Sequence, residues 1–239
     1  MARWSWSLLG MTLVLAAFGS RLNDLDVRAA ESAEEELRPL FDGQSLEGWR
    51  GYRMETVPPS WTLREGELHN DGQGPDLITV ERFRNFELHF EWKIAAGGNS
   101  GVLYRVTEEH AEAYRSGLEY QLLDDPAYKE KTGPSQWTAS IYGLYAAREK
   151  TLHPAGEYNV GKIVVQGNRI EHWLNDEKVA EATRNSVDWQ RRLAASKFHD
   201  WPGFAASPDG HICLQAHGTE ATFRNIRIRI LPDAPPQDR

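Results

Sequence analysis

The chain is poor in cysteine, since Cys213 is the only one among 239 residues. A single thiol cannot form an intrachain disulfide, and it cannot supply the cysteine ligands of a structural zinc site. Clustered cations are lacking as well, because 27 Lys and Arg are outnumbered by 35 Asp and Glu, which gives a net charge of −8. Nucleic acid as a partner is therefore disfavoured, because phosphate binding requires a basic patch.

Three common catalytic motifs are also missing. The sequence has no Gly-x-Ser-x-Gly nucleophile elbow, no His-Glu-x-x-His zinc helix and no Gly-rich phosphate loop followed by Lys and Ser or Thr. No single strand-like segment carries the alternating carboxylates of a two-carboxylate glycosidase, although such a pair could assemble from separate strands. These absences remove support from three large classes of enzyme.

Long hydrophobic runs are absent too. The apolar stretch at residues 8–18 follows Arg3, and small residues that could serve as cleavage sites stand at its end, Ala17 and Gly19, or later, Ala29 and Ala30. Such a stretch is too short to span a bilayer, so residues 1–30 are predicted to be a secretory signal peptide, with an uncleaved anchor as the alternative. We expect a secreted or periplasmic protein without a membrane span after signal cleavage.

The remaining chain shows one domain and no linker or repeat. An acidic leader at residues 31–36 precedes a predicted domain over residues 37–232. The last residues, 233–239, contain Pro235 and Pro236 and are predicted to be a disordered tail.

Alternation with a period of two residues runs through the predicted domain. In residues 87–94, apolar and polar side chains alternate without a break, which is typical of a half-buried strand. Only residues 187–197 look helical. Strands at this density predict an all-β fold, a sandwich of two antiparallel sheets. Similar strand-like segments occur at residues 61–68, 101–106, 118–123, 162–166, 169–174, 177–182, 212–216 and 223–230.

The same alternation sorts the polar side chains. Glu119 and Gln121 point away from the apolar side chains of their strand, and Gln215 and His217 point away from those of theirs. If the two strands are neighbours in one sheet, a carboxylate, an imidazole and two amides converge on one concave face. Such a face can bind and turn over a polyol.

Further polar and aromatic residues are candidates for the same face, although each also has a structural interpretation. Arg105 and Lys162 stand opposite apolar neighbours and would add cations, while polar side chains on outer strand faces are often only solvated. Asp124 precedes Pro126 and could serve a turn, as could Asn99 and Ser100 in their Gly-rich segment. Trp137, Trp189 and Trp201 are either core residues or platforms on which a sugar stacks.

Several ordered motifs resemble those of 3-keto-disaccharide hydrolase domains. The resemblance extends from about residue 40 to residue 230, and Asp176 departs from it by replacing a Gly in an Asn-Gly turn. It implies a concanavalin A-like jelly-roll sandwich whose members cleave glycosides that carry a ketone at sugar carbon 3. The matching segments are LFDGQSLEGW at 40–49, GNSGVLY at 98–104, GLEYQLLD at 117–124, SIYG at 140–143, PAGEYN at 154–159 with WLN at 173–175, and GHICLQAHG at 210–218 with FRNIRI at 223–228.

That chemistry suggests roles for the candidate residues. A ketone at C3 acidifies the hydrogen on C2, so the reaction needs one base and one electrophile. The base would be His217 or Glu119, and Arg105, Lys162 or a bound divalent cation would stabilise the enolate. Glu119, Asp124 and His217 are a plausible oxygen and nitrogen ligand set for such a metal. The substrate would be held by Asn99, Ser100, Gln121, Asp124, Gln215 and Trp137.

Two other functions remain open at this point. The same sandwich serves non-catalytic carbohydrate-binding modules, because a fold does not dictate function. A structural or adhesion domain is a further alternative, although it would not need an imidazole beside a carboxylate. Turnover of a 3-keto-glycoside separates these alternatives from the enzyme.

Overall fold

The structure of the protein is a computed structural model that describes residues 37–233. These residues belong to one folded unit of the chain. The predicted signal peptide and acidic leader lie outside the described residues, as does the predicted tail apart from Asp233. Those three predictions therefore remain predictions.

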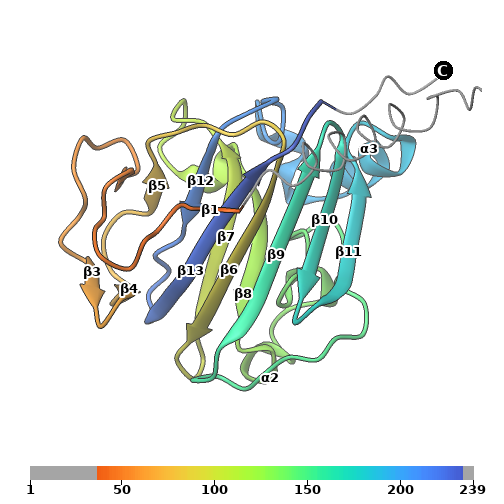
Figure 1. The fold of residues 1–239 in the computed structure, drawn as a ribbon. Coiled ribbons are helices and arrows are strands. Elements are labelled where there is room, and N and C mark those ends of the chain that lie inside the picture. The colour runs from red at the N-terminus through yellow and green to blue at the C-terminus, as the bar shows by residue number, and fades with distance from the viewer. Residues whose placement is uncertain (1–36, 234–239) are drawn as a thin grey trace, which may run out of the picture. The chain divides into compact units, whose positions relative to one another are not determined.

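Two antiparallel sheets make up the fold (Figure 1). The eight-stranded sheet, called here the large sheet, has the order β11-β10-β9-β6-β13-β4-β3, with β1 beside β13. The five-stranded small sheet has the order β2-β5-β12-β7-β8. The large sheet contains β1 (Arg38–Pro39), β3 (Trp61–Arg64), β4 (Glu67–Asn70), β6 (Phe86–Ile94), β9 (Asn159–Gln166), β10 (Arg169–Leu174), β11 (Glu177–Thr183) and β13 (Ala221–Ile230), and the small sheet contains β2 (Trp49–Gly51), β5 (Leu77–Thr79), β7 (Asn99–Val106), β8 (Leu118–Leu123) and β12 (His211–Leu214).

The core lies between the sheets, where the alternating apolar side chains meet. In β6, every second residue from Phe86 to Ile94 is buried. Phe90 packs edge-to-face on Tyr120 of β8 at 5.3 Å between ring centroids, and Phe86 packs in the same way on Tyr104 of β7 at 6.2 Å. These pairs join the two sheets and confirm the predicted β-sandwich.

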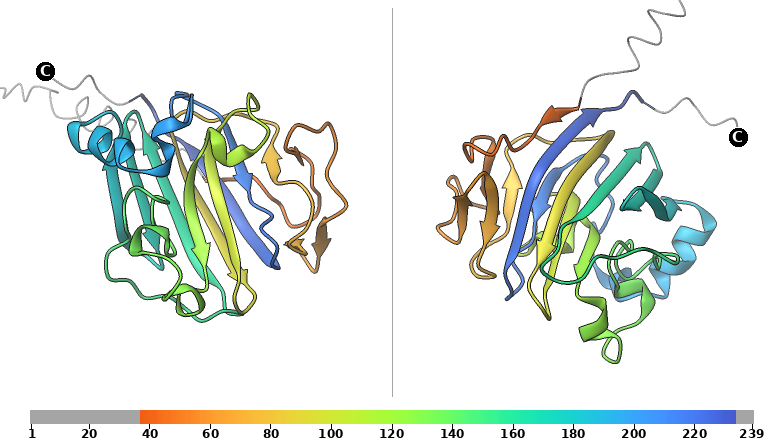
Figure 2. Two further views of the ribbon diagram at one scale, coloured as in Figure 1. Left: turned by 180° about the vertical axis from the view of Figure 1, so that it is seen from behind. Right: turned by 60° about the horizontal axis from the view of Figure 1, so that its bottom comes forward.

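In the described part of the chain the helices are few and short. They are α2 (Asp125–Tyr128), α3 (Val187–Ala194) and the 3₁₀ turns η1 (Ala113–Arg115), η2 (Pro134–Gln136) and η3 (Lys197–Asp200). In the views of Figure 2 the helices stand at the ends of the strands. Within residues 37–233, no helix is long and apolar enough to cross a membrane.

Two predicted elements differ from the structure in their bounds. The single strand predicted over 61–68 is a hairpin of β3 and β4, because Glu65 and Gly66 both take positive φ, at 51° and 82°, and reverse the chain. The helix predicted over 187–197 ends at Ala194, and a separate turn, η3, begins at Lys197. The hairpin turn at Glu65 and Gly66 is not visible in the alternation, because the side chains before and after it keep the same pattern of polar and apolar residues.

A β-bulge in β7 redirects Arg105. His211 pairs with Val106 and Cys213 with Leu103, so Tyr104 and Arg105 together oppose Ile212. Arg105 takes a φ of 58°, and a bulge of this kind re-aims a side chain. Its guanidinium is buried, with Nη2 donating a hydrogen bond to the carbonyl of Gly167, in the turn between β9 and β10, at 2.7 Å.

Candidate active site

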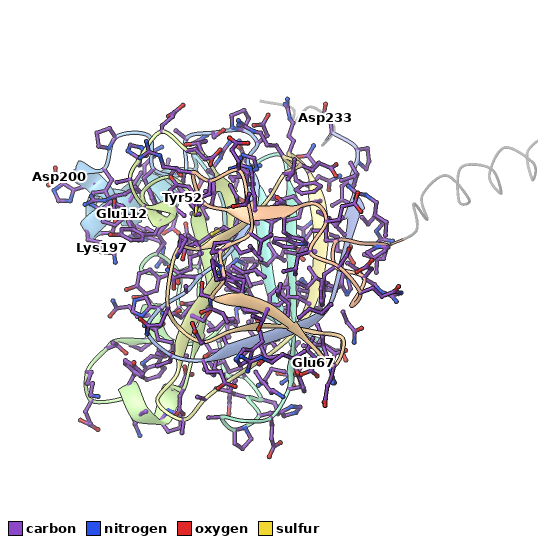
Figure 3. The ribbon with its side chains drawn as sticks, turned by 90° about the vertical axis from the view of Figure 1, so that its left-hand side faces the viewer. Tyr52, Glu67, Glu112, Lys197, Asp200 and Asp233 are labelled. Carbon is purple, nitrogen blue, oxygen red and sulfur yellow. The ribbon has the colours of Figure 1, made fainter. Side chains whose placement is uncertain are left out.

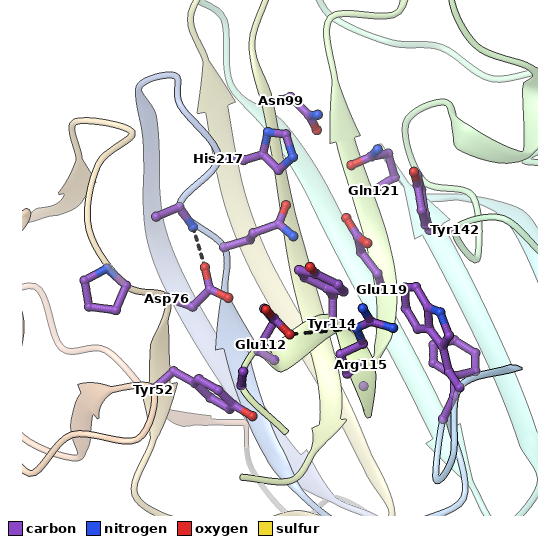
Figure 4. Close-up of a pocket in the computed structure, with 18 of the residues that line it drawn as sticks. Tyr52, Asp76, Asn99, Glu112, Tyr114, Arg115, Glu119, Gln121, Tyr142 and His217 are labelled. Atoms are coloured by element: carbon purple, nitrogen blue, oxygen red, sulfur yellow. Dashed lines mark hydrogen bonds and ion pairs between the residues drawn. The ribbon is translucent and has the colours of Figure 1, made fainter. Parts of the chain in front are cut away.

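A cleft of about 630 Å³ lies on the face of the small sheet that points away from the core. Its floor comes from β7, β8 and the segment that follows β12, and its walls come from residues 52–53, 74–76, 111–117 and 197–204, with Tyr142. Figure 4 shows Asp76 and His217 on one side of the cleft and Glu119, Gln121 and Tyr142 on the other. Loops far apart in the chain thus enclose one polar hollow.

Five of the predicted residues line this cleft, four of them predicted from alternation and Asn99 from its Gly-rich turn. They lie on the outward face of the small sheet, in which β7 separates β8 from β12; Tyr120 and Leu122 point into the core and leave the alternate side chains of β8 on this face. The backbone N–H of Gln215 donates to the carbonyl of Gly101 at 3.0 Å, which holds the segment after β12 against β7. The five residues are Asn99, Glu119, Gln121, Gln215 and His217.

His217 stands in a loop that is attached to the sheet on both sides of the residue. The N–H of Ala216 donates to Oδ1 of Asp76 at 2.9 Å, and the N–H of Gly218 donates to the carbonyl of Gly72 at 2.8 Å. Gly72 has a φ of +87°, and a Cβ there would lie 2.4 Å from the nitrogen of Thr219. The exposed imidazole of His217 is therefore presented by a backbone that is held close to its neighbours.

Two carboxyl groups in the cleft, those of Asp76 and Glu119, are half-buried. Burial raises the pKa of Glu119 to about 8, with the charge of Asp76 adding to the increase and the charge of Lys197 opposing it. Burial also raises the pKa of Asp76 to about 6, against the hydrogen bond from Ala216 and the charge of His217. A cleft that holds carboxyl groups in two protonation states near neutral pH can both take up and release protons.

One wall of the cleft carries cations on aromatic rings. Lys197 lies 4.5 Å from the ring centroid of Tyr142, with its Nζ 3.3 Å from the hydroxyl of that residue. Arg115 lies 4.4 Å from the ring centroid of Trp201 and forms an ion pair with Glu112 at 3.7 Å. Figure 3 shows Tyr52, Glu112 and Lys197 gathered on one side of the molecule, away from Glu67 of the large sheet. This wall brings two cations to a cleft that also contains Arg53 and the carboxyl groups of Asp76, Glu112 and Glu119.

The two cations predicted for the polar face lie elsewhere. Lys162 belongs to β9 of the large sheet, where its Nζ lies 3.8 Å from the ring centroid of Trp173. Arg105 is 1 % exposed and turned into the interior by the bulge in β7. The expectation that these two side chains face the same hollow as Glu119 is corrected by this placement, because strand alternation does not reveal which sheet a strand joins or where a bulge interrupts it.

Three other predicted residues are also outside the cleft. Ser100 is fully buried, and its hydroxyl donates to the carbonyl of Gln215 at 2.8 Å, so it supports the floor from below. Asp124 accepts a hydrogen bond from the N–H of Gly97 at 2.7 Å, as the turn interpretation expects. Trp137 follows η2 and is half-buried away from the cleft.

Of the other two tryptophans, only one reaches the cleft. Trp189 is a core residue of α3 that stacks near Tyr145 at 6.1 Å between ring centroids. Trp201 lines the cleft, but Arg115, Phe198 and Phe204 all pack on its ring. A sugar would meet the edge of this cluster rather than a free indole face.

The predicted metal ligands do not assemble. Asp124 bonds to the turn at Gly97 and does not line the cleft with Glu119 and His217. Among residues 37–233, no group of three or more His, Cys, Asp or Glu side chains is placed to hold a metal ion. The residues present do not fit the proposed oxygen and nitrogen set, so no step of the chemistry below is assigned to a metal.

The structure adds two functional candidates that alternation could not identify. Asp76 precedes β5, a three-residue strand that is buried throughout and so shows no alternation. Lys197 begins η3, in the segment that the sequence predicted to continue a helix. No pattern in the sequence marks Asp76, because its partial burial is a property of the folded chain.

Known proteins are similar to this chain in sequence and in structure. A protein of Bacteroides thetaiotaomicron named 3-keto-disaccharide hydrolase is 36% identical over 224 residues, which is 80% of this chain and 77% of that protein. The crystal structure of a candidate glycosyl hydrolase from Parabacteroides distasonis superposes with a TM-score of 0.79 at 33% identity, and covers 84% of this chain and 97% of that one. A second candidate glycosyl hydrolase from the same organism superposes with a TM-score of 0.65 at 27% identity, over 82% of this chain and all of that one.

The family profile described as the 3-keto-alpha-glucoside-1,2-lyase-like domain matches residues 36–229. This range includes both sheets and every wall of the cleft. It confirms the resemblance seen in the sequence motifs. The chain belongs to the family of 3-keto-alpha-glucoside-1,2-lyase-like domains, and it is a glycoside-cleaving enzyme.

Proposed function

We propose that this enzyme acts on glycosides that carry a ketone at sugar carbon 3, by removing the proton on C2, eliminating the substituent on C1 and hydrating the product. The ketone makes the C2 hydrogen acidic, because the electrons of the broken C–H bond are delocalised onto the ketone oxygen. A base within hydrogen-bond reach and a donor for the leaving oxygen are then sufficient. The names of the relatives support this choice of substrate.

One observation carries the proposal. Glu119 of β8 and His217 of the loop after β12 line one cleft, together with the amide side chains of Asn99, Gln121 and Gln215. Amides can bind sugar hydroxyls as donors and as acceptors, while the titratable groups move protons. A binding face alone would not require carboxyl groups whose pKa values burial brings to about 6 and about 8.

Lys197 takes the electrostatic role that the sequence assigned to Arg105 or Lys162. Its ammonium lines the cleft, and its charge acts on Glu119 from the wall that holds Tyr142. A fixed positive charge near the ketone oxygen stabilises the enolate as negative charge develops there.

The test is release of an aglycone from matched substrates. The purified protein is incubated with methyl glucoside and with its 3-keto derivative, and release of methanol is measured. We expect turnover of the ketone only, and loss of that turnover in a protein that carries both His217→Ala and Glu119→Ala. Binding without turnover would instead favour a carbohydrate-binding module, and turnover that survives the double substitution would remove this cleft as the site.

We also propose that the chain is exported, on the basis of the signal-like residues 1–30. The full-length chain expressed in a bacterium should appear in the periplasm or the medium, and its N-terminal sequence should begin after the apolar stretch. Retention of the whole chain in the cytoplasm would contradict this proposal without affecting the chemistry.

A further inference from the structure

We propose that Asp76 is the proton acceptor at C2 and that Glu119 is the proton donor to the leaving oxygen. The inference rests on the proposed function, and it divides the roles within the same cleft. Neither the sequence motifs nor the comparisons point to Asp76, which entered the site only through the fold. The proposal stands on the positions of the two carboxyl groups, Asp76 on a wall of the cleft and Glu119 on its floor, and on what surrounds each of them.

One carboxylate oxygen of Asp76 is held by a hydrogen bond from the backbone. Its Oδ1 accepts the hydrogen bond from the N–H of Ala216 at 2.9 Å. Figure 4 shows the other oxygen turned toward the cleft, on the side of Glu119. Its surroundings are the buried thiol of Cys213 beneath it and the imidazole of His217 next along the loop. A carboxylate anchored through one oxygen can offer the other to a substrate C–H with little loss of freedom.

Glu119 approaches from the opposite side. It lies on β8 against Gly101 of β7, so close that a Cβ at Gly101 would stand 2.5 Å from Oε1. The charged groups that act on it are Lys197 from the wall and Asp76 from across the cleft. Glu112 and Arg115, on the remaining wall, neutralise one another as an ion pair. Glu119 thus lies against the backbone of the floor, with a cation on one side of it.

The difference in surroundings separates the two protonation states. Burial raises the pKa of Glu119 to about 8 and that of Asp76 to about 6. At neutral pH Glu119 therefore holds its proton while Asp76 is mostly ionised, because desolvation disfavours the charged form more strongly at Glu119 and the charge of Asp76 adds to that effect. The ionised group is suited to accept a proton and the neutral group to donate one.

His217 has a supporting role in this scheme. Its imidazole is exposed at the end of the cleft, in the loop whose preceding N–H binds Asp76. Its charge favours the ionised form of Asp76, since it lowers the pKa of that carboxyl against the effect of burial. His217 is therefore a positioning residue that keeps the acceptor ionised, and it need not touch the C2 hydrogen.

The elimination balances with these two groups alone. The C2–H bond breaks and its proton passes to the carboxylate of Asp76, while the electron pair forms the C2=C3 bond of an enolate with the negative charge on the C3 oxygen. The enolate then reforms the C3 ketone, the pair moves to make a C1=C2 bond, and the C1–O bond breaks. The leaving oxygen takes the proton of Glu119, which becomes a carboxylate.

Hydration runs the same steps in reverse with water in place of the alcohol. The Glu119 carboxylate removes a proton from water as its oxygen bonds to C1, and the electrons of the C1=C2 bond pass to the enolate. Asp76 then returns its proton to C2. Both carboxyl groups end in their starting states, so the pair needs no further acid or base to complete a turnover.

The experiment separates proton removal from bond cleavage. Exchange of the C2 hydrogen is followed by NMR in D₂O, with an enzyme-free control, for two 3-keto-glucosides: one with a 4-nitrophenyl aglycone and one with a methyl aglycone. Release of each aglycone is measured in parallel. The variants are Asp76→Asn, which keeps an oxygen able to accept from Ala216, and Glu119→Gln, which keeps the size of the side chain.

We expect Asp76→Asn to lose exchange and release of both aglycones by about 100-fold or more. Glu119→Gln should keep exchange and nitrophenolate release within about tenfold, but lose methanol release by about 100-fold, because nitrophenolate leaves without a proton. The proposal would be overturned if Asp76→Asn retained exchange of the C2 hydrogen, or if Glu119→Gln lost that exchange.

A second measurement does not depend on the folding of Asp76→Asn. In the unsubstituted protein, exchange should rise with pH through about 6, as Asp76 ionises. This rise should persist in His217→Asn and move toward higher pH, because the imidazole no longer favours the carboxylate. A rise that vanishes in His217→Asn would make His217 the acceptor. An unsubstituted protein that neither exchanges nor releases would defeat the proposed function itself.

Discussion

A methyl group on Gly101 would stand 2.5 Å from Oε1 of Glu119. Gly101 of β7 pairs with Gln121 of β8, which places Glu119 diagonally across from it on the same face of the sheet. The missing side chain is therefore what allows the carboxyl to lie flat against the floor of the cleft. Gly101 has no side chain that could take part in catalysis, but it affects the position of Glu119, the proposed proton donor.

Gly101→Ala should reduce turnover of methyl 3-keto-glucoside by about 100-fold, since a displacement of about 1 Å in a catalytic group can have this effect. The added methyl meets the end of a flexible side chain, so the free energy of unfolding should change by less than about 1 kcal/mol. Aglycone release and urea unfolding measure the two quantities. Full turnover in this variant would show that the position of Glu119 is unimportant.

Gly161→Ala is the matched control for that substitution. A Cβ at Gly161 would lie 2.3 Å from Cζ of Phe90, within the core between the sheets. It should lower the free energy of unfolding by about 1–3 kcal/mol, as overpacking does, and leave turnover per folded molecule unchanged.

Lys197→Met should lower turnover by about 10- to 100-fold, because the cleft loses the positive charge that stabilises the enolate. Lys162→Met removes the same charge from the outer face of the large sheet, where the ammonium lies on Trp173. It should leave turnover within about twofold. Equal effects of the two substitutions on initial rates would indicate a general effect of net charge and would contradict the role of Lys197.

Glu119→Gln should weaken the dependence of stability on pH. The pKa of Glu119 in the folded protein, about 8, exceeds its ordinary value of 4.5, so the folded state holds the proton more firmly. The corresponding stabilisation is complete below 4.5 and is lost as the pH rises toward 8. Between pH 5 and pH 8.5, the free energy of unfolding in urea should fall by at least about 1 kcal/mol more in the unsubstituted protein than in Glu119→Gln. Glu112→Gln, at an exposed carboxyl of the same cleft, should behave as the unsubstituted protein does.

Arg105→Met should leave turnover per folded molecule within about threefold. Its guanidinium binds the carbonyl of Gly167 and does not line the cleft. Steady-state rates normalised to the folded fraction provide the measurement. A loss of 100-fold would restore the direct role that the sequence suggested for this arginine.

Much of the fold was predictable because it depends on patterns that repeat along the chain. The alternation in β6 and β8 identified both strands and the outward direction of Glu119 and Gln121. The turn at Glu65 and Gly66 was not visible in the same way, since a reversal of the chain leaves the polarity pattern intact. Short buried strands such as β5 carry no alternation at all.

The candidate site also has one part that the sequence predicted and another part that only the folded chain decided. The sequence alone determined the class of fold and the outward direction of Glu119, Gln121, Gln215 and His217, because alternation shows the direction of side chains along one strand. Its ordered motifs, through their resemblance to known domains, indicated the family. The folded chain alone decided that Lys162 lies on the other sheet, that a bulge buries Arg105, and that Asp76 and Lys197 enter the cleft. The physical reason is that the neighbours of a side chain, and with them its charge state and reach, depend on contacts between segments far apart in sequence.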